Sequence, residues 1–214
     1  MSFFASRGIL VSQGSKVSIM SSAPKRSLAG LTFILLVLVS SIAFGAPRDR
    51  DRKSRWTPSS FFVQGGSGDT DTYAYTVGAA WDWNWQRQLS IGRLTGYTEV
   101  AVGRWQHDIS ASKDSQWFTQ VGATPVLRLY PEAGDGRWFT EIGIGANYIA
   151  PLYLTDRKHF STKFNFGDHA AVGRILDNEG RSSVALRYQH FSNAGIDSPN
   201  PGENFTQLRF SYQF

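Results

Sequence analysis

The stretch YAYTVGAAWDWNW, residues 73–85, decides the fold because its side chains alternate between two kinds. Successive side chains of a β-strand point to opposite faces, so residues two apart share a face. One face is apolar: Tyr73, Tyr75, Val77, Ala79, Trp81, Trp83 and Trp85. The other face is small or polar: Thr72, Ala74, Thr76, Gly78, Ala80, Asp82 and Asn84. A helix would scatter both sets around its circumference, so the stretch predicts one long strand.

The same period of two recurs along the chain. It is clear over residues 117–129, 138–148, 183–189 and 208–214, and weaker over 60–66, 94–106 and 163–175. Turn-like stretches such as GGSGD, PEAGDG and LDNEGR separate several of these segments. Together the segments predict an all-β fold, an eight-stranded antiparallel barrel, because closing the sheet removes its unpaired edges.

The chemistry of the two faces favours a transmembrane barrel of the bacterial outer membrane over a soluble, lipocalin-like barrel. Trp and Tyr lie near strand ends of the apolar face, as in an interfacial girdle. The opposite face carries glycines and charges that we expect to pair inside a narrow lumen: Asp82, Glu99, Arg128, Glu141 and Arg187. In 94–106 we expect Tyr97, Glu99 and Trp105 to face inward and Val100 and Val102 to face lipid. The last residue, Phe214, resembles the signal that the barrel-assembly machinery recognises.

The N-terminal region has the pattern of an export signal. Lys25 and Arg26 precede the apolar run LAGLTFILLVLVSSIAFGA, and Ala43 and Gly45 fit the small-x-small cleavage pattern. We expect a signal peptide over 1–45, with Met20 as an alternative start, a basic arm over 46–58 and the barrel over 59–214. A membrane anchor is the alternative, but the apolar run is short for a span of about 20 residues.

Composition argues against several other classes of site. The chain of 214 residues has no cysteine, which excludes disulfides and thiolate metal ligands. His107 and His169 share no ligand spacing, so we expect structural roles for them and no metal. The net charge of +5 comes without a basic helix or an aromatic–basic platform, so nucleic-acid binding is not expected.

Two polar residues interrupt an apolar face near the C-terminus. His190 and Ser192 have the parity of Val184, Leu186 and Tyr188, so they face lipid if those three do. Polar side chains are costly at mid-membrane and less so near an interface. The Cβ atoms of residues two apart on a strand are about 6–7 Å apart, so the His190 ring can come within hydrogen-bond reach of Ser192 Oγ. A histidine base beside a serine nucleophile is the pair used in acyl transfer. A site facing the membrane would act on a lipid ester; bonding to loop backbone or lipid headgroups is the alternative.

The block HFSNAGI at 190–196, followed by PN and an acidic residue, resembles the lipid A 3-O-deacylase (PagL) family, as do AWDWNW at 80–85 and GRLTGY at 92–97. The resemblance runs from about residue 62 to residue 214. It implies an eight-stranded outer-membrane barrel that hydrolyses the ester-linked 3-O acyl chain of lipid A, the membrane anchor of lipopolysaccharide. It implies a Ser-His-Glu triad on the lipid-facing surface among outer-membrane lipids, without a metal or other cofactor. The sequence also allows a homodimer.

Carried over residue by residue, the resemblance assigns Ser192 as the nucleophile, His190 as the general base, and Asn193 and Gly195 to the oxyanion hole. The family's acid lies about twelve residues after the serine, where this chain has Asn204. Glu203 precedes it, and we expect Glu203 to serve as the acid from a non-strand conformation, with Asp197 as the other nearby carboxylate. A non-enzymatic outer-membrane barrel, with a structural, adhesion or carrier role, is the alternative function.

Overall fold

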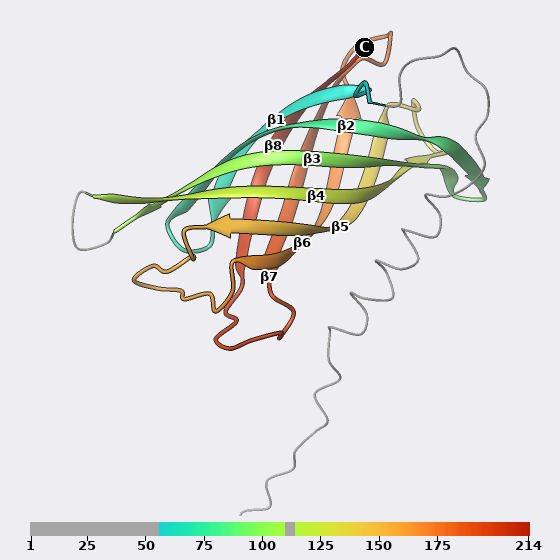
Figure 1. Ribbon diagram of the computed structural model, residues 1–214. Helices are drawn as coiled ribbons and strands as arrows, with labels where there is room; N and C mark the ends of the chain where they lie inside the picture. The colour runs from blue at the N-terminus through green and yellow to red at the C-terminus, as the bar shows by residue number, and fades with distance from the viewer. Residues whose placement is uncertain (1–55, 110–113) are drawn as a thin grey trace, which may run out of the picture.

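The computed structural model of the chain describes residues 56–109 and 114–214 and shows one closed antiparallel barrel (Figure 1). Its strands are β1 (Ser60–Gly68), β2 (Thr72–Leu89), β3 (Gly92–Asp108), β4 (Ser115–Pro131), β5 (Trp138–Ala150), β6 (Phe164–Ile175), β7 (Ser182–Ser192) and β8 (Glu203–Gln213). No helix within the described ranges is long and apolar enough to span a membrane. The expected signal peptide and most of the expected basic arm lie outside the described residues.

Each strand pairs with its neighbour in sequence, and β1 pairs with β8 to close the barrel. The connections 90–91, 132–137 and 176–181 lie at the end that holds the start of β1 and the end of β8. The longer connections 151–163 and 193–202 lie at the other end. Bacterial outer-membrane barrels have short periplasmic turns and longer extracellular loops. We therefore call the end with 151–163 and 193–202 the outer end.

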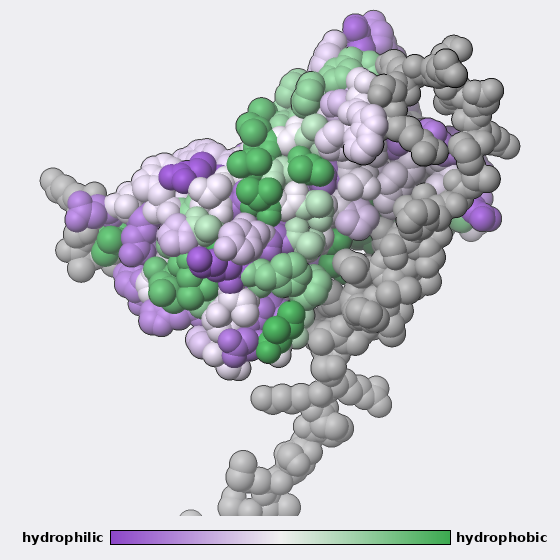
Figure 2. All heavy atoms as spheres, viewed as in Figure 1, coloured by the Kyte–Doolittle hydropathy of each residue, from purple (hydrophilic) through white to green (hydrophobic). Residues whose placement is uncertain are grey.

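The alternation of the strands places their side chains as predicted. Apolar side chains are exposed on the barrel exterior along every strand, for example Val63, Val77, Val100, Val121, Ile142, Val172, Leu186 and Leu208. Tyr97, Glu99 and Trp105 are buried inside, opposite the exposed Val100 and Val102. Hydrophobic residues gather over the middle of the visible face, and hydrophilic residues are more frequent toward its upper and left extremes (Figure 2). This distribution suits a barrel whose middle lies in lipid.

The interior is held by buried ion pairs. Glu99 accepts hydrogen bonds from Arg187 (Nη1–Oε1 2.9 Å) and from Arg209 (Nη1–Oε2 2.6 Å). Arg128 donates through Nε to Oε1 of Glu141 at 2.6 Å. Asp82 differs from the expectation: it lies at the inner rim, beside a register shift between Asp82 and Gln86, and its carboxylate accepts from Gln213 Nε2 at 2.9 Å. Asp82 is exposed at this rim, and within the described residues its carboxylate bonds to an amide and forms no ion pair.

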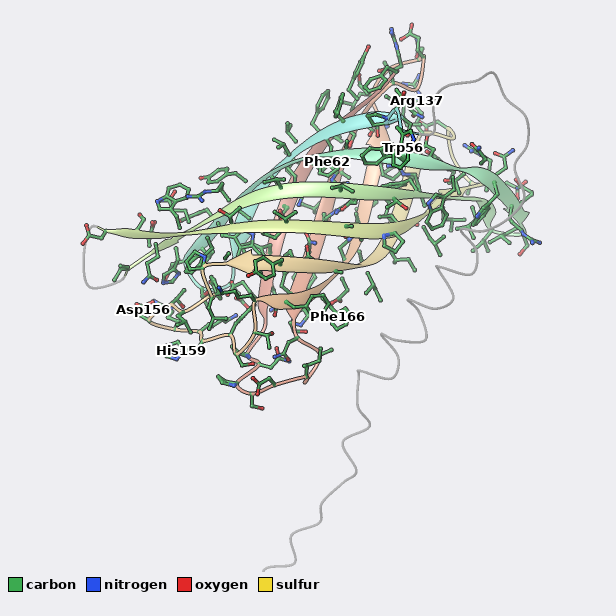
Figure 3. The ribbon with its side chains drawn as sticks, in the orientation of Figure 1. Trp56, Phe62, Arg137, Asp156, His159 and Phe166 are labelled. Atoms are coloured by element: carbon green, nitrogen blue, oxygen red, sulfur yellow. The ribbon has the colours of Figure 1, made fainter. Side chains whose placement is uncertain are left out.

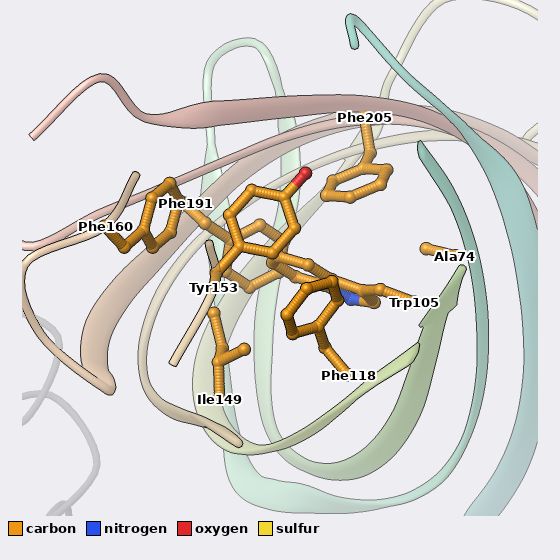
Figure 4. Close-up of a cluster of buried hydrophobic side chains, with 8 residues drawn as sticks. All are labelled: Ala74, Trp105, Phe118, Ile149, Tyr153, Phe160, Phe191 and Phe205. Atoms are coloured by element: carbon orange, nitrogen blue, oxygen red, sulfur yellow. The ribbon is translucent and has the colours of Figure 1, made fainter. Parts of the chain in front are cut away.

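A cluster of buried apolar side chains fills the outer end of the lumen (Figure 4). Its members are Ala74, Trp105, Phe118, Ile149, Tyr153, Phe160, Phe191 and Phe205. The ring of Trp105 lies 4.8 Å, centroid to centroid, from the rings of both Phe191 and Phe205. Phe191 comes from β7 and Phe205 from β8, so the cluster fixes these two strands where one ends and the other begins.

Candidate active site

His190 and Ser192 lie at the outer end of β7 and point out of the barrel, both half-buried. Phe191 lies between them in sequence and points inward into the aromatic cluster. Ser192 pairs across the sheet with Phe166 of β6, which Figure 3 labels. Because Phe191 is locked in the cluster, the strand presents His190 and Ser192 on a fixed outward face.

The side chain of Asn204 forms a hydrogen bond with the His190 ring. The two face each other across β7 and β8, and His190 Nδ1 lies 2.7 Å from Asn204 Oδ1. Asn204 Nδ2 donates to Asp69 Oδ2 at 2.8 Å, which directs the amide oxygen toward the imidazole. Since an amide oxygen only accepts, Nδ1 carries the proton in this arrangement. The other ring nitrogen, Nε2, is then the basic one.

Glu203 lies inside the barrel and does not contact His190, which differs from the expectation. β8 begins as a regular strand at Glu203, so this residue has the inward parity of Phe205 and Arg209. Its Oε2 accepts from Thr70 Oγ1 (2.8 Å) and Tyr153 OH (3.2 Å) and lies 3.3 Å from Lys158 Nζ. The non-strand conformation that would turn Glu203 outward is not present. Asp197, the other carboxylate considered, is exposed in the loop and accepts from the backbone of Ser198.

Residues 73–213 match the sequence model of the family described as Lipid A 3-O-deacylase (PagL). The chain belongs to this family. It is 40% identical over 123 residues to the lipid A deacylase PagL of Bordetella bronchiseptica, covering 58% of this chain and 65% of that protein. It is 36% identical over 117 residues to the lipid A deacylase PagL of Pseudomonas aeruginosa, covering 54% and 62%. The chain thus spans just under two thirds of the length of these two curated relatives.

The crystal structure of the outer membrane enzyme PagL matches this PagL-family chain with a TM-score of 0.61 at 27% identity. The match covers 72% of this chain and 99% of that one. Together with the closed barrel, it assigns the chain to the outer membrane, as its alternating pattern predicted.

The loop after Ser192 is braced by Asn193, one of the two residues that the PagL resemblance assigns to the oxyanion hole. Its buried side chain donates through Nδ2 to Ser161 Oγ and to the Asp197 carbonyl, each at 2.9 Å. Its Oδ1 accepts from the Gly195 backbone N–H at 2.9 Å. The N–H groups of both assigned residues are thus engaged, since the Asn193 N–H bonds to Asn200 Oδ1. An oxyanion would have to displace one of these internal acceptors.

Gly202 keeps space free beside the basic edge of the imidazole. It is buried with φ +68°, and a Cβ added there would lie 2.5 Å from His190 Cε1 and 3.2 Å from Nε2. Only glycine combines this left-handed backbone with so close an approach. Sequence reasoning missed Gly202, although its place in a PG dipeptide next to the expected site offered a signal.

A second polar array lies at the outer end and includes Asp156 of the loop 151–163. His107 is fully buried, with Nδ1 3.0 Å from Thr72 Oγ1 and Nε2 2.7 Å from Asp156 Oδ1. His169 is buried in the lumen, and neither of its ring nitrogens has a hydrogen-bond partner among the described residues. Within the described ranges, no group of three His, Asp or Glu residues could hold a metal ion.

Proposed function

We propose that this chain hydrolyses the ester-linked 3-O acyl chain of lipid A, with Ser192 as nucleophile and His190 as general base. The observation that carries the proposal is a histidine and a serine on the outward face of β7, with the histidine tautomer set by Asn204. The names of the two relatives and the family description support the substrate class. A barrel that only bound or supported other molecules would gain nothing from a polar, tautomer-fixed pair on its lipid-facing wall.

The location of the pair favours a lipid as the substrate. The two side chains lie at the outer end of β7, above the exposed Tyr188 and Leu186. A lipid of the outer leaflet can lay its acyl chain along this apolar wall and bring its ester to the level of Ser192. A soluble ester has no long acyl chain to lay along this wall, so the geometry favours a lipid A-type amphiphile.

The reaction is acyl transfer to serine followed by hydrolysis. Nε2 of His190 takes the Ser192 proton as the hydroxyl oxygen attacks the ester carbonyl, and the imidazolium then returns this proton to the leaving sugar hydroxyl. A water molecule, deprotonated by the same nitrogen, then attacks the acyl carbonyl; the bond to Ser192 Oγ breaks, the fatty acid leaves and the imidazolium returns the proton to Ser192. The Ser192 hydroxyl makes no hydrogen bond to the described residues; such bonds are often long before substrate binds.

Asn204 is the third member of this site in our proposal. Its amide holds the ring as a carboxylate does in a serine triad, and an amide fills this place in papain-like proteases. Glu203, the residue that the sequence favoured, is separated from the imidazole because it faces the lumen. A Glu203→Gln change therefore tests the Ser-His-Glu arrangement directly.

The test is mass spectrometry of lipid A from Gram-negative cells that express the wild type, Ser192→Ala or Glu203→Gln. We expect the wild type to remove one hydroxyacyl chain, Ser192→Ala to lose this activity by at least ~10³-fold, and Glu203→Gln to keep it. Purified protein with lipid A in detergent repeats the comparison for an enzyme that is latent in cells. Equal release by the wild type and Ser192→Ala would contradict the proposed nucleophile.

A further inference from the structure

Four outward residues form one row across the outer end of the sheet. Asp168 of β6 pairs with His190 of β7, and His190 pairs with Asn204 of β8. The row continues into the turn after β1, because the Asp69 backbone N–H donates to the Asn204 carbonyl at 3.1 Å. Carboxylates thus end the row on both sides of the imidazole.

Among the described residues, only the Asp69 end is connected to His190 by hydrogen bonds. Asp69 Oδ2 accepts from Asn204 Nδ2 at 2.8 Å, and Asn204 Oδ1 lies 2.7 Å from His190 Nδ1. The Asp168 carboxylate makes no hydrogen bond to the ring within the described part of the chain. Asn204 itself is neutral, so by itself it can orient the ring but cannot balance the charge of an imidazolium.

We infer that Asp69 is the positioning carboxylate of this site and acts on His190 through the Asn204 amide. The inference rests on the esterase proposed above and adds a residue that lies before the segment 73–213 matched by the family model. The negative charge on Asp69 holds the amide in one orientation and stabilises the imidazolium that forms as Ser192 attacks.

Asp69 is itself held in place from the far side. Lys158 Nζ, from the loop 151–163, donates to Asp69 Oδ1 at 2.6 Å and lies 3.3 Å from Glu203 Oε2. Burial works in the opposite direction, but hydrogen bonding with Glu203, Lys158 and Asn204 lowers the pKa of Asp69 below its usual range. Asp69 is therefore ionised at neutral pH, as its role requires.

The decisive change is Asp69→Asn, which removes the charge and leaves an oxygen that can still accept from Asn204. We expect kcat for release of fatty acid from lipid A in detergent to fall roughly 10- to 100-fold, with KM within about threefold. The double variant Asp69→Asn with Asn204→Asp moves the carboxylate directly onto the imidazole, and we expect it to recover most of the lost kcat. A residue that only supported the fold would not be rescued in this way.

Asp71→Asn is the matched control. Asp71 lies in the same turn, is exposed, and pairs with Arg157 (3.0 Å) and not with the row. We expect its kcat to stay within about twofold of the wild type. Heat-modifiable migration on gels checks that each barrel is folded.

The outcomes separate this inference from the function on which it rests. Wild type and Ser192→Ala that release fatty acid equally would remove the esterase and this inference with it. An active wild type and an inactive Ser192→Ala, with Asp69→Asn at full kcat, would overturn the role of Asp69 alone. So would an Asp168→Asn variant that loses kcat while Asp69→Asn does not, because Asp168 would then be the carboxylate.

Discussion

Replacing Gly202 with alanine tests whether the position of the His190 ring limits activity. The new Cβ would lie 2.5 Å from His190 Cε1 and 3.3 Å from the Phe191 carbonyl oxygen. Carbon atoms in contact lie about 3.5–4.0 Å apart, so the ring has to move by roughly 1 Å. That movement breaks the alignment with Asn204, and a misplacement of about 1 Å costs on the order of 10²-fold in rate.

The same substitution also strains the backbone. Gly202 has φ +68°, and an L-residue in this conformation costs roughly 1–2 kcal/mol. Gly180, in the turn between β6 and β7 at the inner end, has φ +76° and nothing within 4 Å of an added Cβ. Gly180→Ala is therefore a control that carries the backbone strain without the collision.

The assay compares both variants for kcat on lipid A in detergent and for unfolding in urea. We expect Gly180→Ala to lose about 1–2 kcal/mol of unfolding free energy, Gly202→Ala to lose at least as much because it adds the collision, and Gly202→Ala alone to lose activity. Full activity in Gly202→Ala would refute the reasoning, and so would an equal loss in Gly180→Ala, because activity would then follow stability and not the ring.

Two further predictions concern the lumen. Glu99→Ala removes the carboxylate that pairs with both Arg187 and Arg209, and Arg187 keeps only its longer contact with Glu141, so we expect the free energy of unfolding in urea to fall by about 3–5 kcal/mol. Removing the exposed Glu179, 3.8 Å from Arg181, should cost less than about 1 kcal/mol. Similar losses in both variants would show that the lumenal charges are solvated. Trp105→Ala removes the centre of the aromatic cluster, and we expect the free energy of unfolding in urea to fall by about 3–5 kcal/mol. An unchanged urea midpoint would mean that the cluster does not hold β7 and β8.

Much of the architecture could be predicted from sequence because strand parity is a local property. The alternation over residues 73–85 predicted a strand with one lipid-facing side. Strand parity also placed Glu99 inside the barrel and Val100 outside it, as the structure shows. Parity also put His190 and Ser192 together on the outward face. Each statement needs only the neighbours two positions away, so no knowledge of other strands was required.

The partners of His190 could not be read in this way because they depend on lateral register and on barrel closure. The sequence-based choice of Glu203 required β8 to begin later than it does; once Glu203 starts the strand, its parity turns it inward and Asn204 outward. Asp69 reaches the site only because β1 pairs with β8 and closes the sheet.

The sequence by itself therefore determined the inner and outer faces and the histidine–serine pair, since both follow from a period of two along a strand, and the recurrence of this period in eight segments predicted the barrel. Only the tertiary structure decided which oxygen faces the imidazole. That choice depends on hydrogen bonds between β7, β8 and the turn after β1, segments that lie far apart in the chain and meet because a barrel has no free edge.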